Sequence, residues 1–216
     1  MALTSRMGLR IFLAAAIGTA ALVLLMNIAN TAAPATAPPS SSPSPAKAPQ
    51  PSNASAPIVA SKVFIVADDF VVDIFLNGQR VPDVARRVTS ENFGATAEEV
   101  TAEIRAGDSM VFNVVNNRLR WNGACYFGAA GMAGDGAITF VSEEADAWSV
   151  CEDPGLAPRF IAEPGYLAER PVQIITNRWS GGDRQMNRQV PRWSGQPIWG
   201  SPTNRNIWLK LNVPKA

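Results

Sequence analysis

The amino-acid sequence predicts an all-β protein, a single β-sandwich or jelly roll preceded by one N-terminal transmembrane helix and a proline-rich linker. Three observations support this. An uncharged apolar run occupies residues 11–29, and 8 of the 17 prolines fall between Pro34 and Pro57. After residue 60, apolar residues recur with a period of two, which is typical of β-strands with one buried face. The remaining region of about 155 residues is long enough to bury one hydrophobic core.

The N-terminus has the pattern of a membrane anchor. Residues 1–10 carry Arg6 and Arg10, and such positive charges stay on the cytoplasmic side. Residues 11–29 would form a helix about 28 Å long, enough to span a bilayer. We therefore expect an uncleaved signal-anchor in a bacterial-type inner membrane, with the folded domain in the periplasm. The alternative is a signal peptide that is removed, which would give a secreted protein.

Residues 30–60 are predicted to form a linker. They are mostly Ala, Pro, Ser and Thr, and Lys47 is their only charged residue. Prolines at this density favour polyproline II, in which 24 residues would extend on the order of 70 Å at about 3.1 Å each. The linker would hold a folded domain, residues 61–216, well away from the membrane.

The folded domain is predicted to contain about eight short strands. Residues 71–76, Asn77-Gly78 and 79–81 form a hairpin pattern, because a type I′ turn favours Asn-Gly at its centre. The other expected strands are residues 63–66, 100–104, 109–116, 121–127, 137–141, 148–151, 172–176 and 207–213. No segment of this region keeps a helical apolar period over three turns.

Two of these strands show which side chains face the core. Met110, Phe112 and Val114 share one face of residues 109–116. In the last strand, apolar residues at 207, 209, 211 and 213 alternate with Trp208, Lys210 and Asn212.

Several segments of the folded domain occur in a recognisable order: Ala67–Phe70, Ile74–Val81, Val100–Ile104, Ala106–Val114, the Gly/Ala-rich residues 123–136, Trp148–Val150 and Gln196–Gly200. This order resembles the galactose-binding-like jelly rolls, reasonably over residues 63–154 and loosely beyond. The resemblance implies a jelly-roll fold and a binding role, since the members are mostly non-catalytic sugar-binding, accessory or interaction modules. Many of them hold a structural calcium. Their ligand loops differ, so the resemblance implies no particular site.

The composition argues against most enzymatic chemistry. The chain has no histidine, which excludes Ser-His-Asp and Cys-His catalysis and His-ligated zinc. Glu98-Glu99 is a candidate carboxylate pair, but adjacent strand residues point to opposite faces and cannot flank one glycosidic bond. We therefore predict that the protein is not an enzyme, and a hydrolase without histidine is the third hypothesis. A net charge of +1, together with export, argues against nucleic acid as a partner.

Two structural sites are considered. Cys125 and Cys151 are predicted to form a disulfide, which would stabilise an exported domain by roughly 3.5 kcal/mol; the alternative is two buried free thiols. Asp68, Asp69 and Asp73 are candidate ligands for a structural calcium, the one cofactor considered. The alternative is that these aspartates are turn and strand-end carboxylates in water.

Charge divides the folded domain into two parts. Residues 61–154 carry 7 basic and 15 acidic side chains, and residues 155–216 carry 9 basic and 3 acidic ones. One interpretation is that the basic part packs on the acidic part within one domain. The other is that a basic face meets anionic lipid, acidic glycans or an acidic protein.

The basic part also holds four of the six tryptophans. Trp199 and Trp208 are expected in the core. Trp179 and Trp193, each followed by Ser-Gly, are expected on exposed loops, with burial as the alternative. The candidate binding residues are Arg178, Trp179, Arg184, Arg188, Arg192 and Trp193, because exposed Trp and Arg are common in binding hot spots.

These features lead to two leading hypotheses of function. The first is a membrane-tethered accessory or structural subunit that docks onto a protein partner in a membrane assembly. The second is a carbohydrate-binding module for envelope or extracellular glycans.

Overall fold

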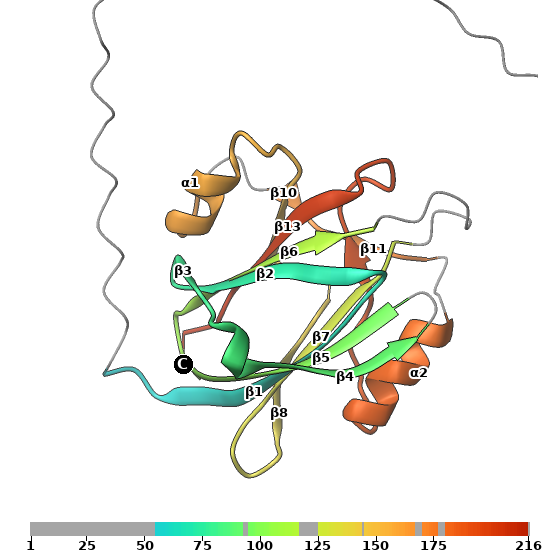
Figure 1. The fold of residues 1–216 in the computed structure, drawn as a ribbon. Coiled ribbons are helices and arrows are strands. Elements are labelled where there is room, and N and C mark those ends of the chain that lie inside the picture. The colour runs from blue at the N-terminus through green and yellow to red at the C-terminus, as the bar shows by residue number, and fades with distance from the viewer. Residues whose placement is uncertain are drawn as a thin grey trace, which may run out of the picture. The chain divides into compact units, whose positions relative to one another are not determined.

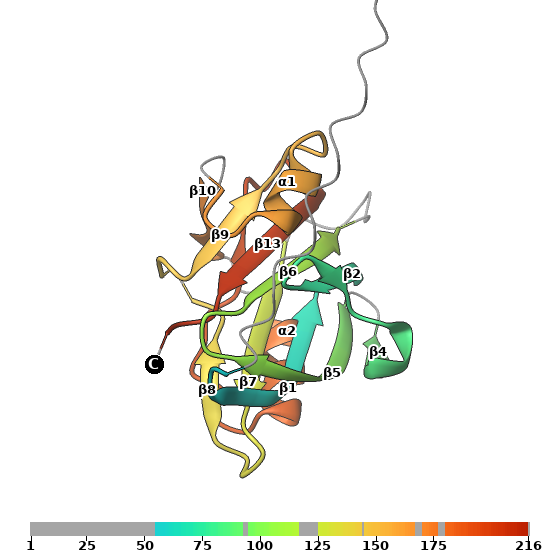
Figure 2. The same ribbon diagram turned by 90° about the vertical axis from the view of Figure 1, so that its left-hand side faces the viewer.

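The computed structural model describes residues 55–92, 95–116, 125–143, 145–166, 170–176 and 180–215. In this part, two antiparallel sheets pack face to face, and a helix lies on the outer face of each (Figures 1 and 2). The expected anchor, residues 11–29, and linker residues 30–54 lie outside the described residues. No helix in the described ranges is both long and apolar enough to cross a membrane.

The two sheets contain most of the strands. The five-stranded sheet has, in spatial order, β4 (Arg86–Asn92), β5 (Ala95–Arg105), β1 (Ile58–Ala67), β7 (Phe127–Met132) and β8 (Ile138–Val141). The six-stranded sheet has β10 (Arg170–Pro171), β9 (Trp148–Cys151), β13 (Asn206–Asn212), β6 (Ser109–Val115), β2 (Phe70–Leu76) and β3 (Gln79–Arg80). Further elements are the ribbon β11 (Gln173–Ile174) and β12 (Ile198–Trp199), the 3-10 turn η1 (Asp83–Ala85), and helices α1 (Ala157–Ala162) and α2 (Ser180–Gln189).

The main core lies between the sheets and confirms the predicted inner faces. Met110, Phe112 and Val114 of β6 are fully buried, as are Ile207 and Leu209 of the neighbouring β13. Phe112 lies at the centre of an aromatic group, with its ring centroid 5.2 Å from that of Phe127 and 6.1 Å from that of Trp148. The period-two pattern therefore identified the core-facing side chains correctly.

The predicted hairpin is confirmed between β2 and β3. Leu76 pairs with Gln79, and Asn77 and Gly78 both have positive φ, 51° and 79°. The Asn77 side chain also fixes the next turn, because its Nδ2 donates to Asp108 Oδ1 at 2.9 Å and its Oδ1 accepts from the Ser109 amide at 3.0 Å. The hairpin is thus tied to the start of β6.

Two expected boundaries are wrong. β1 begins at Ile58, so the end of the expected linker is already strand, and Ala60 is fully buried. The expected strand 121–127 lies outside the described residues except at its end, and the strand runs from Phe127 to Met132 instead. Gly131 of this strand is required, because a Cβ there would lie 2.1 Å from Cε1 of Phe140 on β8.

The sandwich also carries two short helices within the described residues. In α1, Ala157 and Phe160 pack on the outer face of the six-stranded sheet, against Val111, Cys151 and Trp208. In α2, inward side chains pack on the outer face of the five-stranded sheet. Both helices are short, and helices of this length depend on such packing rather than on their own propensity. The local apolar period is therefore too brief to reveal them.

The predicted disulfide is wrong, because Cys125 and Cys151 are both free and buried. Cys125 belongs to the core between the sheets, whereas Cys151 faces outward from β9 beneath Phe160 of α1. A bond would have to pass through the six-stranded sheet. Burial raises the pKa of both thiols, which keeps them protonated and unreactive at neutral pH.

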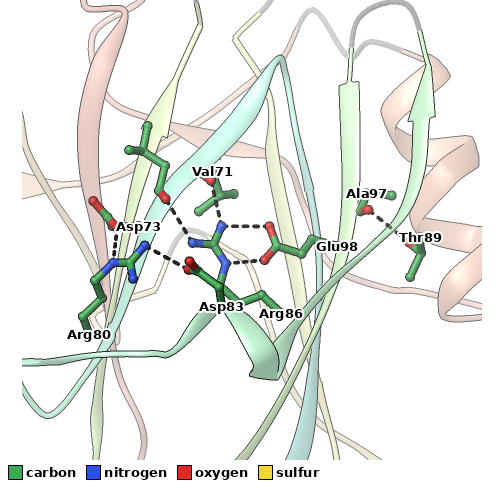
Figure 3. A network of polar contacts seen from close by, with 9 residues as sticks. Val71, Asp73, Arg80, Asp83, Arg86, Thr89, Ala97 and Glu98 are labelled. Atoms are coloured by element: carbon green, nitrogen blue, oxygen red, sulfur yellow. Dashed lines mark hydrogen bonds and ion pairs between the residues drawn. The ribbon is translucent and has the colours of Figure 1, made fainter.

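Arg86 of β4 links the two sheets at one edge of the sandwich (Figure 3). Its guanidinium pairs with Glu98 of β5, with Nε 2.5 Å from Oε1 and Nη2 3.1 Å from Oε2. The same group donates to the carbonyl oxygens of Val71, at 2.8 Å, and Val72, at 3.0 Å, on β2 of the other sheet. Arg86 and Glu98, the edge clamp, therefore join the two sheets.

Candidate docking surface

Helix α2 places the candidate arginines on the outside of the five-stranded sheet. Met186 is fully buried and Val190, just past the helix, is 1% exposed; both contact apolar side chains of that sheet. Near the first turn, the hydroxyl of Tyr126 donates to Asp183 Oδ1 at 2.9 Å. Gly182 is required here, because a Cβ would lie 2.6 Å from the Tyr126 ring. One face of α2 is thus fixed against the sheet.

The opposite side of α2 and the segment just after it carry exposed positive charge. Arg184 and Arg188 lie four residues apart on the helix, Arg192 follows three residues past its end at Gln189, and all three are exposed. None of them forms a hydrogen bond or ion pair with another residue that the structure describes. We call these three residues the basic stripe. Like charges four apart on a helix, such as Arg184 and Arg188, destabilise it by a few tenths of a kcal/mol, so helix stability does not explain this pair.

Arg192 and Trp193 end the α2 segment and explain one wrong prediction. Arg192 has a left-handed backbone, with φ of 65°, and this turn directs Trp193 back under the helix. Trp193 is only 7% exposed, and its Nε1 donates to the carbonyl oxygen of Ala129 at 3.3 Å. Gly195 lies against the indole, where a Cβ would come within 2.5 Å of Nε1. Trp193 therefore anchors the segment instead of contacting a ligand.

The other tryptophans have mixed outcomes. Trp199 is fully buried and Trp208 is 8% exposed, which confirms their placement in the core. Trp179 and its neighbour Arg178 lie outside the described residues. With Trp193 buried, a flat sugar platform made from both Trp179 and Trp193 cannot form.

The three candidate calcium ligands do not come together. Asp73 pairs with Arg80, with Oδ1 2.6 Å from Nε, as Figure 3 shows. Asp68 is 8% exposed, and its Oδ2 accepts a hydrogen bond from Asn116. Across the described ranges, no group of three or more Asp, Glu, Cys or His side chains could hold a metal ion.

Glu98 and Glu99 lie on opposite faces of β5, as their sequence positions predicted. Glu98 belongs to the edge clamp. The Glu99 carboxylate forms an ion pair with Lys62, whose Nζ lies 2.9 Å from Oε1, and a second ion pair with Arg87. Lys62, and then Arg87, hold the pKa of the Glu99 carboxyl below its usual value, against the opposing effect of burial. Both carboxylates are therefore occupied by cations.

Sequence reasoning missed the edge clamp. Arg86 and Glu98 are 12 residues apart, and Arg86 reaches the carbonyl oxygens of β2 only because the sheets pack together. No local pattern marks such a contact.

Comparisons with protein-family models, with curated proteins and with solved structures gave no match to this chain. The resemblance to the galactose-binding-like jelly rolls therefore stays a prediction. The structure supports the coarser description of the fold, a sandwich of two sheets.

Proposed function

We propose that this protein is a non-catalytic, membrane-tethered β-sandwich module that docks through its basic stripe onto an acidic surface of a protein partner in a membrane assembly. The observation that carries the proposal is the stripe itself. Three exposed arginines have no partners among the described residues: Arg184 and Arg188 lie on a helix whose other face is held by a buried core, and Arg192 lies in the turn just after that helix.

The chemistry of the stripe favours carboxylates as its ligands. All three cations are arginines, and a guanidinium presents a planar fork of donors that matches a carboxylate in a bidentate pair. Arginine is also enriched in the few residues that carry most of the energy of a protein interface. Because α2 is fixed against the sheet, little order would be lost in docking, which favours affinity.

The rest of the sequence agrees with a role in placement. The predicted anchor would keep the domain at the membrane, and the predicted linker would let it search on the order of 70 Å around the anchor. The absence of histidine removes the usual catalytic groups. The carbohydrate-binding alternative is weakened, because Trp193, one of its two expected platform residues, is buried.

The experiment compares partner capture by the full chain and by stripe variants. The chain is expressed in its own membranes, crosslinked, extracted in detergent and analysed by mass spectrometry. Replacing Arg184, Arg188 and Arg192 together by Gln should remove the captured partner. The same capture should weaken as salt rises from low to physiological strength, because exposed charge pairs are screened.

A matched variant controls for net charge. Replacing Arg80, Arg159 and Lys215 by Gln removes the same three charges from elsewhere on the domain and should leave capture unchanged. Equal capture by the stripe variant and the wild type would contradict the proposal. Stripe-dependent binding to anionic vesicles, with no captured protein, would assign the stripe to lipid instead.

A further inference from the structure

A second candidate site, independent of the basic stripe, lies at the end of the six-stranded sheet. Its outermost strand, β10, is only two residues long and pairs with β9 through Arg170 and Pro171. Beyond this short pairing the surface has a cavity of about 520 Å³. Its lining includes Asp146, Trp148, Ser149, Arg170, Pro171 and Val172.

The lining of this cavity is mainly apolar. Trp148 and Val172 are each only 2% exposed and belong to the main core, so the apolar surface that a ligand can reach comes from the half-buried Ala145 and the exposed Pro171. The Trp148 Nε1 donates to the carbonyl oxygen of Val141 at 3.0 Å, so the indole offers the cavity no free donor. Ser149, which is 7% exposed, also lines the cavity. The accessible apolar surface is therefore small, which suits a compact apolar group.

The rim of the cavity carries two opposite charges. Asp146 precedes β9 and Arg170 belongs to β10, and both side chains are exposed. They form no ion pair with each other, and neither bonds to another residue of the described ranges. A positive and a negative group thus line the same cavity without neutralising one another.

We propose that this cavity binds a small apolar zwitterion, namely a free amino acid or dipeptide with an apolar side chain. The carboxylate of the ligand pairs with the Arg170 guanidinium, and its ammonium group pairs with the Asp146 carboxylate. Its side chain rests on Ala145 and Pro171, above the buried Trp148 and Val172. Ligand sites commonly combine a mainly apolar lining with a few polar groups that fix orientation, and this cavity falls within their usual range of about 300–1,000 Å³.

The proposal is tested with the full chain in detergent and three probes: the free dipeptide alanyl-phenylalanine, the same dipeptide blocked at both ends, and glucuronate. Saturation-transfer NMR and calorimetry measure binding. The free dipeptide should bind, and blocking its ends should weaken binding about fivefold or more, as expected for rim-exposed charge pairs. Failure of the free dipeptide to bind at millimolar concentration, or tighter binding of glucuronate, would overturn the proposal.

Variants then test the two charges. Arg170→Gln and Asp146→Asn should each weaken dipeptide binding about fivefold. The matched replacements Arg80→Gln and Glu91→Gln, also of exposed charges, should leave it unchanged. Wild-type affinity in both rim variants would refute the assignment.

Should a rim variant fail to fold, the wild-type protein still gives a decisive reading. The backbone amide of Val172 and the indole N–H of Trp148 should shift in an NMR titration with the dipeptide. Shifts confined to other residues would place the dipeptide elsewhere and overturn the proposal. None of these measurements involves the basic stripe as a ligand site, so this proposal and the docking function can fail separately.

Discussion

Replacing Glu98 by Gln should strongly destabilise the protein, because the change leaves the Arg86 guanidinium charged and confined at the edge of the sandwich. The side chains of Arg86 and Glu98 are only 12% and 4% exposed. Removing one partner of a buried ion pair typically costs about 3–5 kcal/mol. Arg86 keeps its two bonds to β2 carbonyl oxygens, so we expect the lower end, about 3 kcal/mol.

Thermal unfolding of the full chain, followed by tryptophan fluorescence, measures this effect. For a domain of about 150–250 residues, 1 kcal/mol corresponds to about 2–4 °C, so Glu98→Gln should lower Tm by about 6–12 °C. The matched control is Arg80→Gln, since Arg80 is also in ion pairs but its side chain is 50% exposed. Exposed pairs contribute about 0–1 kcal/mol, so this control should change Tm by at most about 4 °C.

A double replacement separates the ion pair from its two members. Arg86→Met with Glu98→Leu removes both charges, and it should cost less than the sum of the two single changes. Two outcomes would refute the edge clamp as a buried pair. One is a Tm for Glu98→Gln equal to that of Arg80→Gln, and the other is a double variant whose loss equals the sum.

Three further predictions concern other buried contacts. The pKa of Glu99 is lower in the folded protein, so the ionised carboxylate stabilises the fold above its unfolded pKa, and this stabilisation is lost as pH falls through the folded pKa. Glu99→Gln or Lys62→Met should therefore make the free energy of unfolding fall less steeply as pH is lowered. An unchanged slope at acid pH would contradict this. Cys125 and Cys151 should not react with a thiol reagent in the native protein, and both should react after denaturation without reductant; no reactive thiol then would mean that a disulfide exists. Gly182→Ala should lower Tm, because the added methyl group would collide with the Tyr126 ring, and the backbone amides of α2 should exchange hydrogen faster. Wild-type values for both would show that the methyl group can be accommodated there.

Some features were predictable because their cause is local. The turn needs positive φ at both of its central positions, and Asn77 and Gly78 are residue types that adopt positive φ readily, so the adjacent pair alone predicts the turn. Likewise, the alternation in β6 and β13 reflects the fixed two-residue period of a strand. The opposite directions of Glu98 and Glu99 follow from the same period.

The candidate site was only partly predictable. The exposed arginines at 184, 188 and 192 were identified from composition alone. Burial of Trp193 was not, because it depends on the left-handed turn at Arg192 and on the strand β7 beneath it. That Arg184 and Arg188 share one side of a helix was shown only by the structure, since α2 lacks an apolar period of its own.

Sequence by itself determined that the folded domain is built from strands and which of their faces meet in the core, because burial of one strand face repeats every second residue. Only the tertiary structure decided what covers the outer faces. Lys210 points outward from β13, yet it is fully buried, because α1 covers it: its Nζ lies 4.1 Å from the centre of the Phe160 ring and donates to the Glu163 carbonyl oxygen at 3.0 Å. Glu163 lies 47 positions before Lys210 in the chain, and contacts between segments so far apart leave no periodic pattern in the sequence.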